Sequence, residues 1–307
     1  MDRHQPIEKR FIFHANAVAF AAHIRRPADH QFQAVASSCL PVTGGLAQAS
    51  SGPQNYQEIV SFRSASTNAQ GDFADTRRAV DFTHGNHGEN ELSTNTFVDS
   101  KLSGLKIAVA QDHPPTAPGK ILTFAAEELH ARLESSSDRR NPIAFRSLEA
   151  TIKGISVNGR ELIVSTAPEV FSQHETHEKL VKAYEEDGDF RKKFGALFYP
   201  TGHEKSGMGA LLTKHTIPNS KGLIVGTVVT GLKWSGPQAP LQGTTIQGNR
   251  LAIEGIGSIY FGELLIDHRS RRLTLLRFQL GSPVGADGAA CDVQSNGQTW
   301  PPGADGA

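Results

Sequence analysis

The sequence has no net charge and no long apolar run. Lysine and arginine together number 31, as do aspartate and glutamate, so the formal net charge at pH 7 is +0. A balanced chain has no overall field that would draw it onto nucleic acid or an acidic membrane surface. No apolar run approaches the roughly 20 residues that a membrane-spanning helix needs. The composition therefore predicts neither a nucleic-acid partner nor a membrane span.

Cysteine is scarce, because the chain has only Cys39 and Cys291. Two free thiols are expected rather than a disulfide framework. Basic residues followed by an apolar stretch near the N-terminus allow a secretory signal as one interpretation. His14 and Asn16 interrupt that stretch, however, and no cleavage context follows it. A first β-strand is the preferred interpretation, and a cytoplasmic protein is expected.

Familiar catalytic motifs are absent as well. Neither the G-x-S-x-G nucleophile elbow nor the G-x-x-x-x-G-K phosphate loop occurs. The spacing of Gly255, Gly257 and Gly262 does not fit G-x-G-x-x-G, so no dinucleotide cofactor is indicated. An LPVTG segment begins at Leu40 and matches a cell-wall sorting pattern. It lies near the N-terminus, and a turn is therefore preferred.

What the sequence does contain is typical of β structure. Its 30 glycines and 16 prolines favour many strands separated by turns. Every odd position from Phe11 to Ala21 is phenylalanine or alanine, which gives one apolar face of a long strand. The small alanines predict that another sheet packs close to this face. Asn158-Gly159 is typical of a two-residue hairpin turn.

The segment from Leu251 to Gly285 reads as two long, half-apolar strands joined by a short charged turn. We expect this closing hairpin to be paired into the main sheet, because an isolated hairpin is marginal in water. The charged residues of its turn are expected to lie in solvent; they are Asp267, Arg269, Arg271 and Arg272.

Two segments have helical character. Thr123 could cap a short helix through AAEELHARLE. Further on, Leu180, Val181 and Tyr184 recur at helical spacing after a capping Ser172. We expect a helical insertion at 172–199.

The expected fold is mainly β, an antiparallel β-barrel or β-sandwich with this short helical insertion. Residues 1–285 are expected to form a single β-rich domain. The proline-rich segment 112–120 is the place where that domain could divide in two. Residues 286–307 are expected to form an irregular tail.

Two histidine groups are candidate metal ligands. His84, His87 and Glu89 lie on one segment and could hold zinc or another divalent metal ion, although a polar turn is the alternative. His174 and His177 are superficially similar to a zinc-protease helix. That motif needs histidines four positions apart, so the match fails and a polar first helical turn remains.

The candidates for acid–base chemistry are His14, Glu263 and Arg277. We expect Glu263 and Arg277 to face each other across the closing hairpin among apolar neighbours. Such a pair is costly unless it is well hydrogen-bonded, so it is either a structural lock or part of a site. The lock is the preferred interpretation.

The closing hairpin, FGELLIDHRSRRLTLLRFQLGSPVG, resembles C-terminal segments of uncharacterised bacterial proteins. The similarity extends to FHANAVAFAAHIRRP and SCLPVTGG near the other end of the chain. The resemblance implies one full-length family unit. It implies no activity, ligand or catalytic residue.

The expected function is that of a soluble β scaffold that binds a partner or small ligand, or assembles into a homo-oligomer. The absence of a catalytic signature is the reason for this preference over an enzyme. The alternative is a hydrolase or isomerase that uses histidine and carboxylates for acid–base chemistry, with or without a divalent metal ion.

Overall fold

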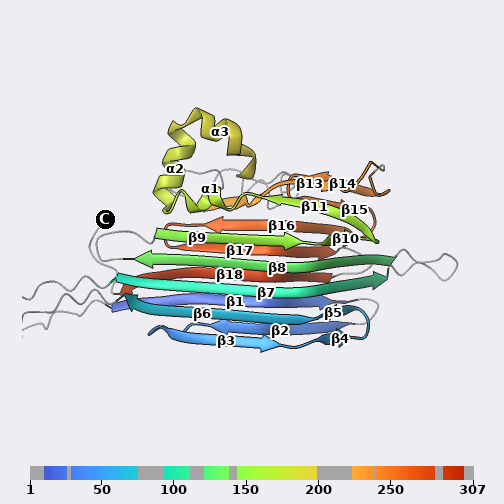
Figure 1. Ribbon diagram of the computed structural model, residues 1–307, viewed down its shortest axis with the longest axis horizontal. Helices are drawn as coiled ribbons and strands as arrows, with labels where there is room; N and C mark the ends of the chain where they lie inside the picture. Colours follow the sequence, from blue (N-terminus) through green and yellow to red (C-terminus); the bar gives the residue numbers. More distant parts are fainter. Residues whose placement is uncertain are drawn as a thin grey trace, which may run out of the picture.

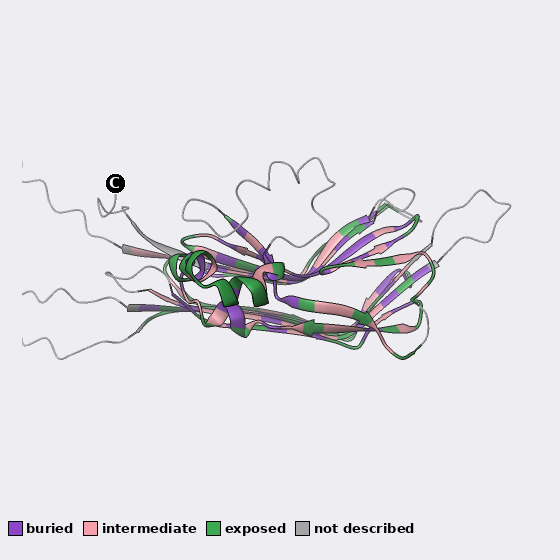
Figure 2. Ribbon diagram, turned by 90° about the horizontal axis from the view of Figure 1, so that it is seen from above, coloured by how far each residue is buried: buried purple, intermediate pink, exposed green. Residues whose placement is uncertain are grey.

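The computed structural model contains two antiparallel sheets that pack face to face, with a group of helices along one edge of the sandwich (Figure 1). The residues that it describes are 10–25, 29–74, 93–110, 121–137, 144–198, 223–237, 240–280 and 286–300. The predicted fold class, mainly β with a short helical insertion, is confirmed. Of the two predicted architectures, the described residues form the sandwich (Figure 2).

The first sheet, sheet A, contains the closing hairpin. Its strand order is β14-β15-β16-β17-β18-β1-β2, and β12 also pairs with β16. The strands are β1 (Arg10–Ile24), β2 (His30–Cys39), β12 (Ile224–Thr227), β14 (Thr244–Gln247), β15 (Arg250–Ile253), β16 (Gly257–Ile266), β17 (Ser270–Leu280) and β18 (Ala286–Trp300). The hairpin β16–β17 therefore has paired neighbours on both sides, as predicted.

The second sheet, sheet B, is built from the middle of the chain. Its order is β13-β11-β10-β8-β7-β5-β4, while β9 pairs with β8 and β6 pairs with β7 and β3. The strands are β3 (Gly45–Ser51), β4 (Gln54–Tyr56), β5 (Val60–Phe62), β6 (Ser64–Ala74), β7 (Ser93–Ala110), β8 (Ile121–Ser137), β9 (Ala144–Lys153), β10 (Ile155–Val157), β11 (Arg160–Thr166) and β13 (Val229–Trp234). The predicted turn at Asn158-Gly159 joins β10 to β11, with both residues at positive φ.

The helix predicted for AAEELHARLE is wrong, because this segment lies within β8. Leu129, Ala131 and Leu133 are buried at alternate positions, and charged residues lie between them. β8 pairs with β7 on one side and β9 on the other. Tertiary pairing therefore overrides a local sequence with good helix formers.

The irregular tail predicted for residues 286–307 is wrong for residues 286–300, while residues 301–307 lie outside the described residues. Residues 286–300 form β18, which lies between β1 and β17. The end of the β body at residue 285 must therefore be moved. The proline-rich segment 112–120 lies outside the described residues. The strands that flank it, β7 and β8, pair with each other, and the single-domain expectation stays a prediction.

In both sheets the alternation of buried and exposed residues shifts by one position partway along the strands. We call the level at which this shift occurs the crease. In β7 the buried positions are even up to Leu102 and odd from Leu105. Gly104 lies between them at a φ of +65°, and Gly154 between β9 and β10 has a φ of +62°. Glycine adopts this left-handed conformation without the steric cost that other residues incur.

In sheet A the crease buries two adjacent residues in each of three strands. These pairs are Ala19-Phe20, Leu275-Leu276 and Ala290-Cys291. In β16 the same level is occupied by Gly262 at a φ of +61°. Between β16 and β17 the pairing keeps its register across the crease, since Phe261 is opposite Leu276 and Glu263 is opposite Thr274. Each strand therefore keeps a face in the core although its alternation is broken.

The core between the sheets is thin where β1 crosses β7. Ala15, Ala17 and Ala19 are buried there, as the alternating pattern predicted. The Ser100 hydroxyl of sheet B donates to the Val18 carbonyl of sheet A at 3.2 Å. Such a direct contact between the backbone of one sheet and a short side chain of the other requires small residues between them.

The helical insertion, which we call the helical cap, lies along one edge of the sandwich, above β9 and β16 and on the side where β16 ends (Figure 1). It consists of α1 (Glu169–Ser172), α2 (His177–Glu186), α3 (Gly188–Phe194) and the 3₁₀ turn η2 (Gly195–Leu197). Thr176 caps α2 by accepting from the Lys179 amide, whereas the predicted cap, Ser172, belongs to α1. No helix among the described residues is long and apolar enough to cross a membrane.

Candidate functional site

The predicted pair Glu263–Arg277 forms a two-pronged ion pair on the outer face of sheet A. Arg277 Nε lies 2.5 Å from Glu263 Oε2, and Arg277 Nη2 lies 2.8 Å from Glu263 Oε1. The guanidinium also stacks on the Tyr260 ring, with 3.9 Å from its carbon to the ring centroid. Burial lowers the pKa of Arg277, but hydrogen bonding and charge attraction from Glu263 outweigh it and raise the pKa overall. This geometry favours the structural lock.

The three acid–base candidates do not converge. His14 is exposed on β1, which is separated from the Glu263 strand, β16, by β18 and β17. Neighbouring strands lie about 4.8 Å apart, so three strand spacings exceed hydrogen-bond reach several times over. The metal candidates His84, His87 and Glu89 lie outside the described residues.

The structure instead joins the second histidine segment to the turn of the closing hairpin. His177 and Glu178 open α2, and the turn at 267–269 carries His268. His268 Nδ1 lies 2.9 Å from Glu178 Oε1, and the ring centroids of His268 and His177 are 4.0 Å apart. One ligand atom from each of these three side chains lies within 4.8 Å of the others. We call this group the cap–turn cluster.

Burial differs sharply within the cap–turn cluster. His177 is 2% exposed, whereas Glu178 and His268 are exposed. Partial burial raises the pKa of Glu178, but hydrogen bonds from His268 and from the start of the helix lower it below its ordinary value overall. The cluster therefore presents a carboxylate and an imidazole to solvent, with a second imidazole behind them.

Arg271 fixes the approach of the cap to the hairpin. Its side chain is fully buried, and it donates to the carbonyls of Phe171 at 2.8 Å and His174 at 2.5 Å. The guanidinium also lies over the Phe145 ring, 4.6 Å from its centroid. Burial lowers the pKa of Arg271 to about 9, against the attraction of Glu175. Arg271 thus ties the main chain before α2 to strand β17.

Glu175 provides a further support for the chain before α2. Its carboxylate accepts from Arg146 Nη1 at 2.6 Å and from Lys179 Nζ at 2.7 Å. Its carbonyl accepts from the Phe145 amide at 2.8 Å. These bonds connect the loop to both β9 and α2, so the position of the cap–turn cluster is set from two sides.

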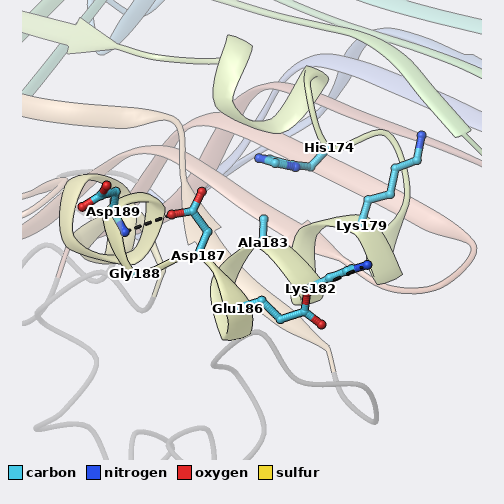
Figure 3. A pocket seen from close by; sticks show the side chains of 8 residues that line it. All are labelled: His174, Lys179, Lys182, Ala183, Glu186, Asp187, Gly188 and Asp189. Atoms are coloured by element: carbon cyan, nitrogen blue, oxygen red, sulfur yellow. Dashed lines mark hydrogen bonds and ion pairs between the residues drawn. The ribbon is translucent and has the colours of Figure 1, made fainter.

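An open hollow lies on the other side of the cap, between α2 and α3 (Figure 3). The His174 ring points into it and makes an edge-to-face contact with Phe190, at a centroid distance of 4.9 Å. Figure 3 shows Lys179 and Lys182 toward one side of the hollow and Asp187 and Asp189 toward the other. Burial, helped by the charge of Arg271, lowers the pKa of His174 below its ordinary value and so favours the neutral ring.

The prediction for one residue of this region, Arg271, is wrong, and no prediction was made for a second, His268. Arg271 was expected in solvent but is 0% exposed, because β17 carries it inward at the level of Phe145. His268 was not singled out, since its partner Glu178 lies 90 positions earlier in the chain. The histidine- and glutamate-rich start of α2 was the only indication of this site in the sequence. A motif contained within one helix gives no information about a ligand that comes from a distant turn.

The fold is an antiparallel β-sandwich with a helical cap, and the cap–turn cluster lies where this cap meets the turn of the closing hairpin. Residues 11–108 match the model of a family described as Domain of unknown function (DUF8256), in agreement with the predicted resemblance to an uncharacterised family. This stretch spans β1 to β7 and ends before the helical cap and the closing hairpin. No curated protein and no solved structure matches the chain.

Proposed function

We propose that this protein is a non-enzymatic β-sandwich scaffold that binds a small ligand at the cap–turn cluster. The observation that carries the proposal is the convergence of His177, Glu178 and His268 from two elements that are distant in sequence. Two of these side chains are exposed, so a ligand can reach them. Converging polar groups on separate elements are typical of binding sites.

The rigidity of the surroundings supports a binding role. Arg271 and Glu175 hold the chain before α2 through hydrogen bonds that connect it to β17, β9 and α2. A site whose groups are already in place loses less entropy when its ligand binds.

The acid–base enzyme remains the rival proposal, and the positions of its candidates weaken it. Both carboxylate oxygens of Glu263 accept hydrogen bonds from Arg277, which disfavours Glu263 as a base. His14 lies three strands away on the same sheet. A shared catalytic pocket would need these groups within hydrogen-bond reach of one substrate.

A cytoplasmic location and self-assembly belong to the same proposal. The exposed thiol of Cys39 suits a reducing compartment, and the edge strands offer backbone groups for pairing between copies. Measuring the native mass of the full chain over a range of concentrations distinguishes a monomeric scaffold from a homo-oligomer.

A thermal-shift screen of the full chain tests the proposed function. The panel would contain metal salts, phosphates, carboxylates and nucleotides, and hydrolase and isomerase substrates would be assayed in parallel. We expect at least one ligand to raise the melting temperature of the wild type and of His14→Gln, but not of His268→Gln. Turnover that is lost in Glu263→Gln or His14→Gln would instead establish the enzyme.

A further inference from the structure

We infer that the ligand of the cap–turn cluster is a divalent transition-metal ion, coordinated by His177, Glu178 and His268. The inference rests on the proposed function, since it names the ligand of the same site. Two imidazoles and one carboxylate are a ligand set that suits zinc, cobalt, nickel and ferrous iron rather than magnesium or calcium.

The spacing of the side chains fits one ion. Ligand atoms at about 2.0–2.2 Å from a tetrahedral zinc ion lie roughly 3.3–3.6 Å from one another. The Glu178–His268 contact is already 2.9 Å, and all three ligand atoms lie within 4.8 Å of one another. Glu178 and His268 are exposed, so rotation of these two side chains would bring their ligand atoms around an ion beside the buried His177.

The backbone that carries these ligands is well held. Thr176 caps α2 immediately before His177. In the hairpin turn, the Asp267 carboxylate accepts from the amides of Arg269 at 2.7 Å and Ser270 at 2.5 Å. The start of α2 thus fixes the backbone of His177 and Glu178, and the hydrogen-bonded turn fixes the backbone of His268. Such supporting hydrogen bonds orient ligands before the metal arrives.

Coordination would have a structural consequence. Within the described part of the chain, the hydrogen bond between His268 and Glu178 links the hairpin turn directly to α2 through their side chains. A metal ion would replace this exposed hydrogen bond with coordination bonds to both elements. The ion would thus fasten the helical cap to the sandwich, and its remaining coordination positions would be open to water or to an anionic group of a partner.

Metal titration of the full chain tests this inference. Protein treated with a chelator would be titrated with zinc and with cobalt, by calorimetry and by the visible absorption of cobalt. We expect one equivalent to bind, with an affinity at least about tenfold lower in His268→Gln and Glu178→Gln. His14→Gln is the matched control and should bind like the wild type. Glu178→Asp should retain a cobalt spectrum, because it keeps the carboxylate.

Two results would overturn the inference. One is a folded wild type that binds none of zinc, cobalt, nickel or copper. The other is metal binding that is undiminished in the Glu178→Gln/His268→Gln double variant. If metals fail while another ligand of the thermal-shift panel binds in a His268-dependent manner, the metal inference is wrong and the proposed function stands. If nothing binds in a His268-dependent manner, both are wrong.

Discussion

At the scale of the residue, Arg271 shows how one buried charge organises the region around it. A guanidinium removed from water is costly, and its charge is balanced here by two backbone carbonyls and an aromatic ring. Replacing it with an apolar residue would leave the carbonyls of Phe171 and His174 without this donor.

Arg271→Met should therefore destabilise the protein by roughly 3 kcal/mol. Arg269→Met, at an exposed position two residues earlier, should change the free energy of unfolding by no more than about 0.5 kcal/mol. Urea unfolding of the two variants measures the difference. Equal effects would mean that the buried guanidinium does not fix the cap.

A second residue-scale prediction concerns pH. On the outer face of sheet B, His130 Nε2 lies 2.5 Å from Asp99 Oδ2, and this hydrogen bond raises the pKa of His130 although burial opposes it. A raised pKa in the folded state means that the folded protein holds the proton more tightly. The stabilisation is complete below the ordinary pKa of about 6.5 and is lost as the pH rises through the folded value.

Comparing the wild type with Asp99→Asn in urea at several pH values isolates this pair. The wild type should exceed the variant in stability by the largest margin at pH 5.5, and the margin should shrink as the pH approaches 9. A margin that grows with pH would show that the proton on His130 does not stabilise the fold.

At the scale of the element, the crease explains both what the sequence predicted and what it could not. The alternation of Phe13, Ala15 and Ala17 lies on one side of the crease, and its prediction was right. In β8 the change of phase at Glu127 places the buried residues Ala126 and Leu129 three positions apart, after which burial alternates again through Ala131. This interval of three interrupts the period of two by which a strand is recognised in a sequence.

The crease also explains why β18 was not predicted from the sequence. Its buried positions include the adjacent pair Ala290-Cys291, which interrupts a period of two. The other residues of β18 are mostly small or polar, a composition that is typical of an irregular tail. Neither the phase change nor its partner strands can be recognised within one segment, because the pairing lies between distant parts of the chain. The cap–turn cluster was hidden for the same reason.

Gly262 offers a test of the crease. Its φ is +61°, and an added Cβ would lie 2.7 Å from Val228 Cγ2. Gly262→Ala should therefore cost roughly 2 kcal/mol or more, from backbone strain and from the clash. Gly231→Ala is the matched control, since it has open space and no positive φ. Chemical unfolding should separate the two, and equal stabilities would contradict the strained geometry.

At the scale of the whole molecule, β18 is the strand that closes sheet A. It joins the first strand of the described chain, β1, to the closing hairpin through pairs that include Ala17 with Val293 and Val293 with Leu273. A chain truncated after residue 285 should lose cooperative unfolding and expose apolar surface. Circular dichroism and dye binding measure this. A truncated protein that unfolds cooperatively at the wild-type temperature would show that residues 286–300 are dispensable.

The helical cap is the other feature that depends on the whole molecule, because the proposed metal site requires a contact between α2 and a turn 90 positions away. Anomalous X-ray scattering from a cobalt-soaked crystal of the full chain tests that account most directly. We predict a single peak about 2.0–2.2 Å from ligand atoms of His177, Glu178 and His268. A structure at saturating cobalt with no peak there, and with the Glu178–His268 hydrogen bond intact, would contradict it.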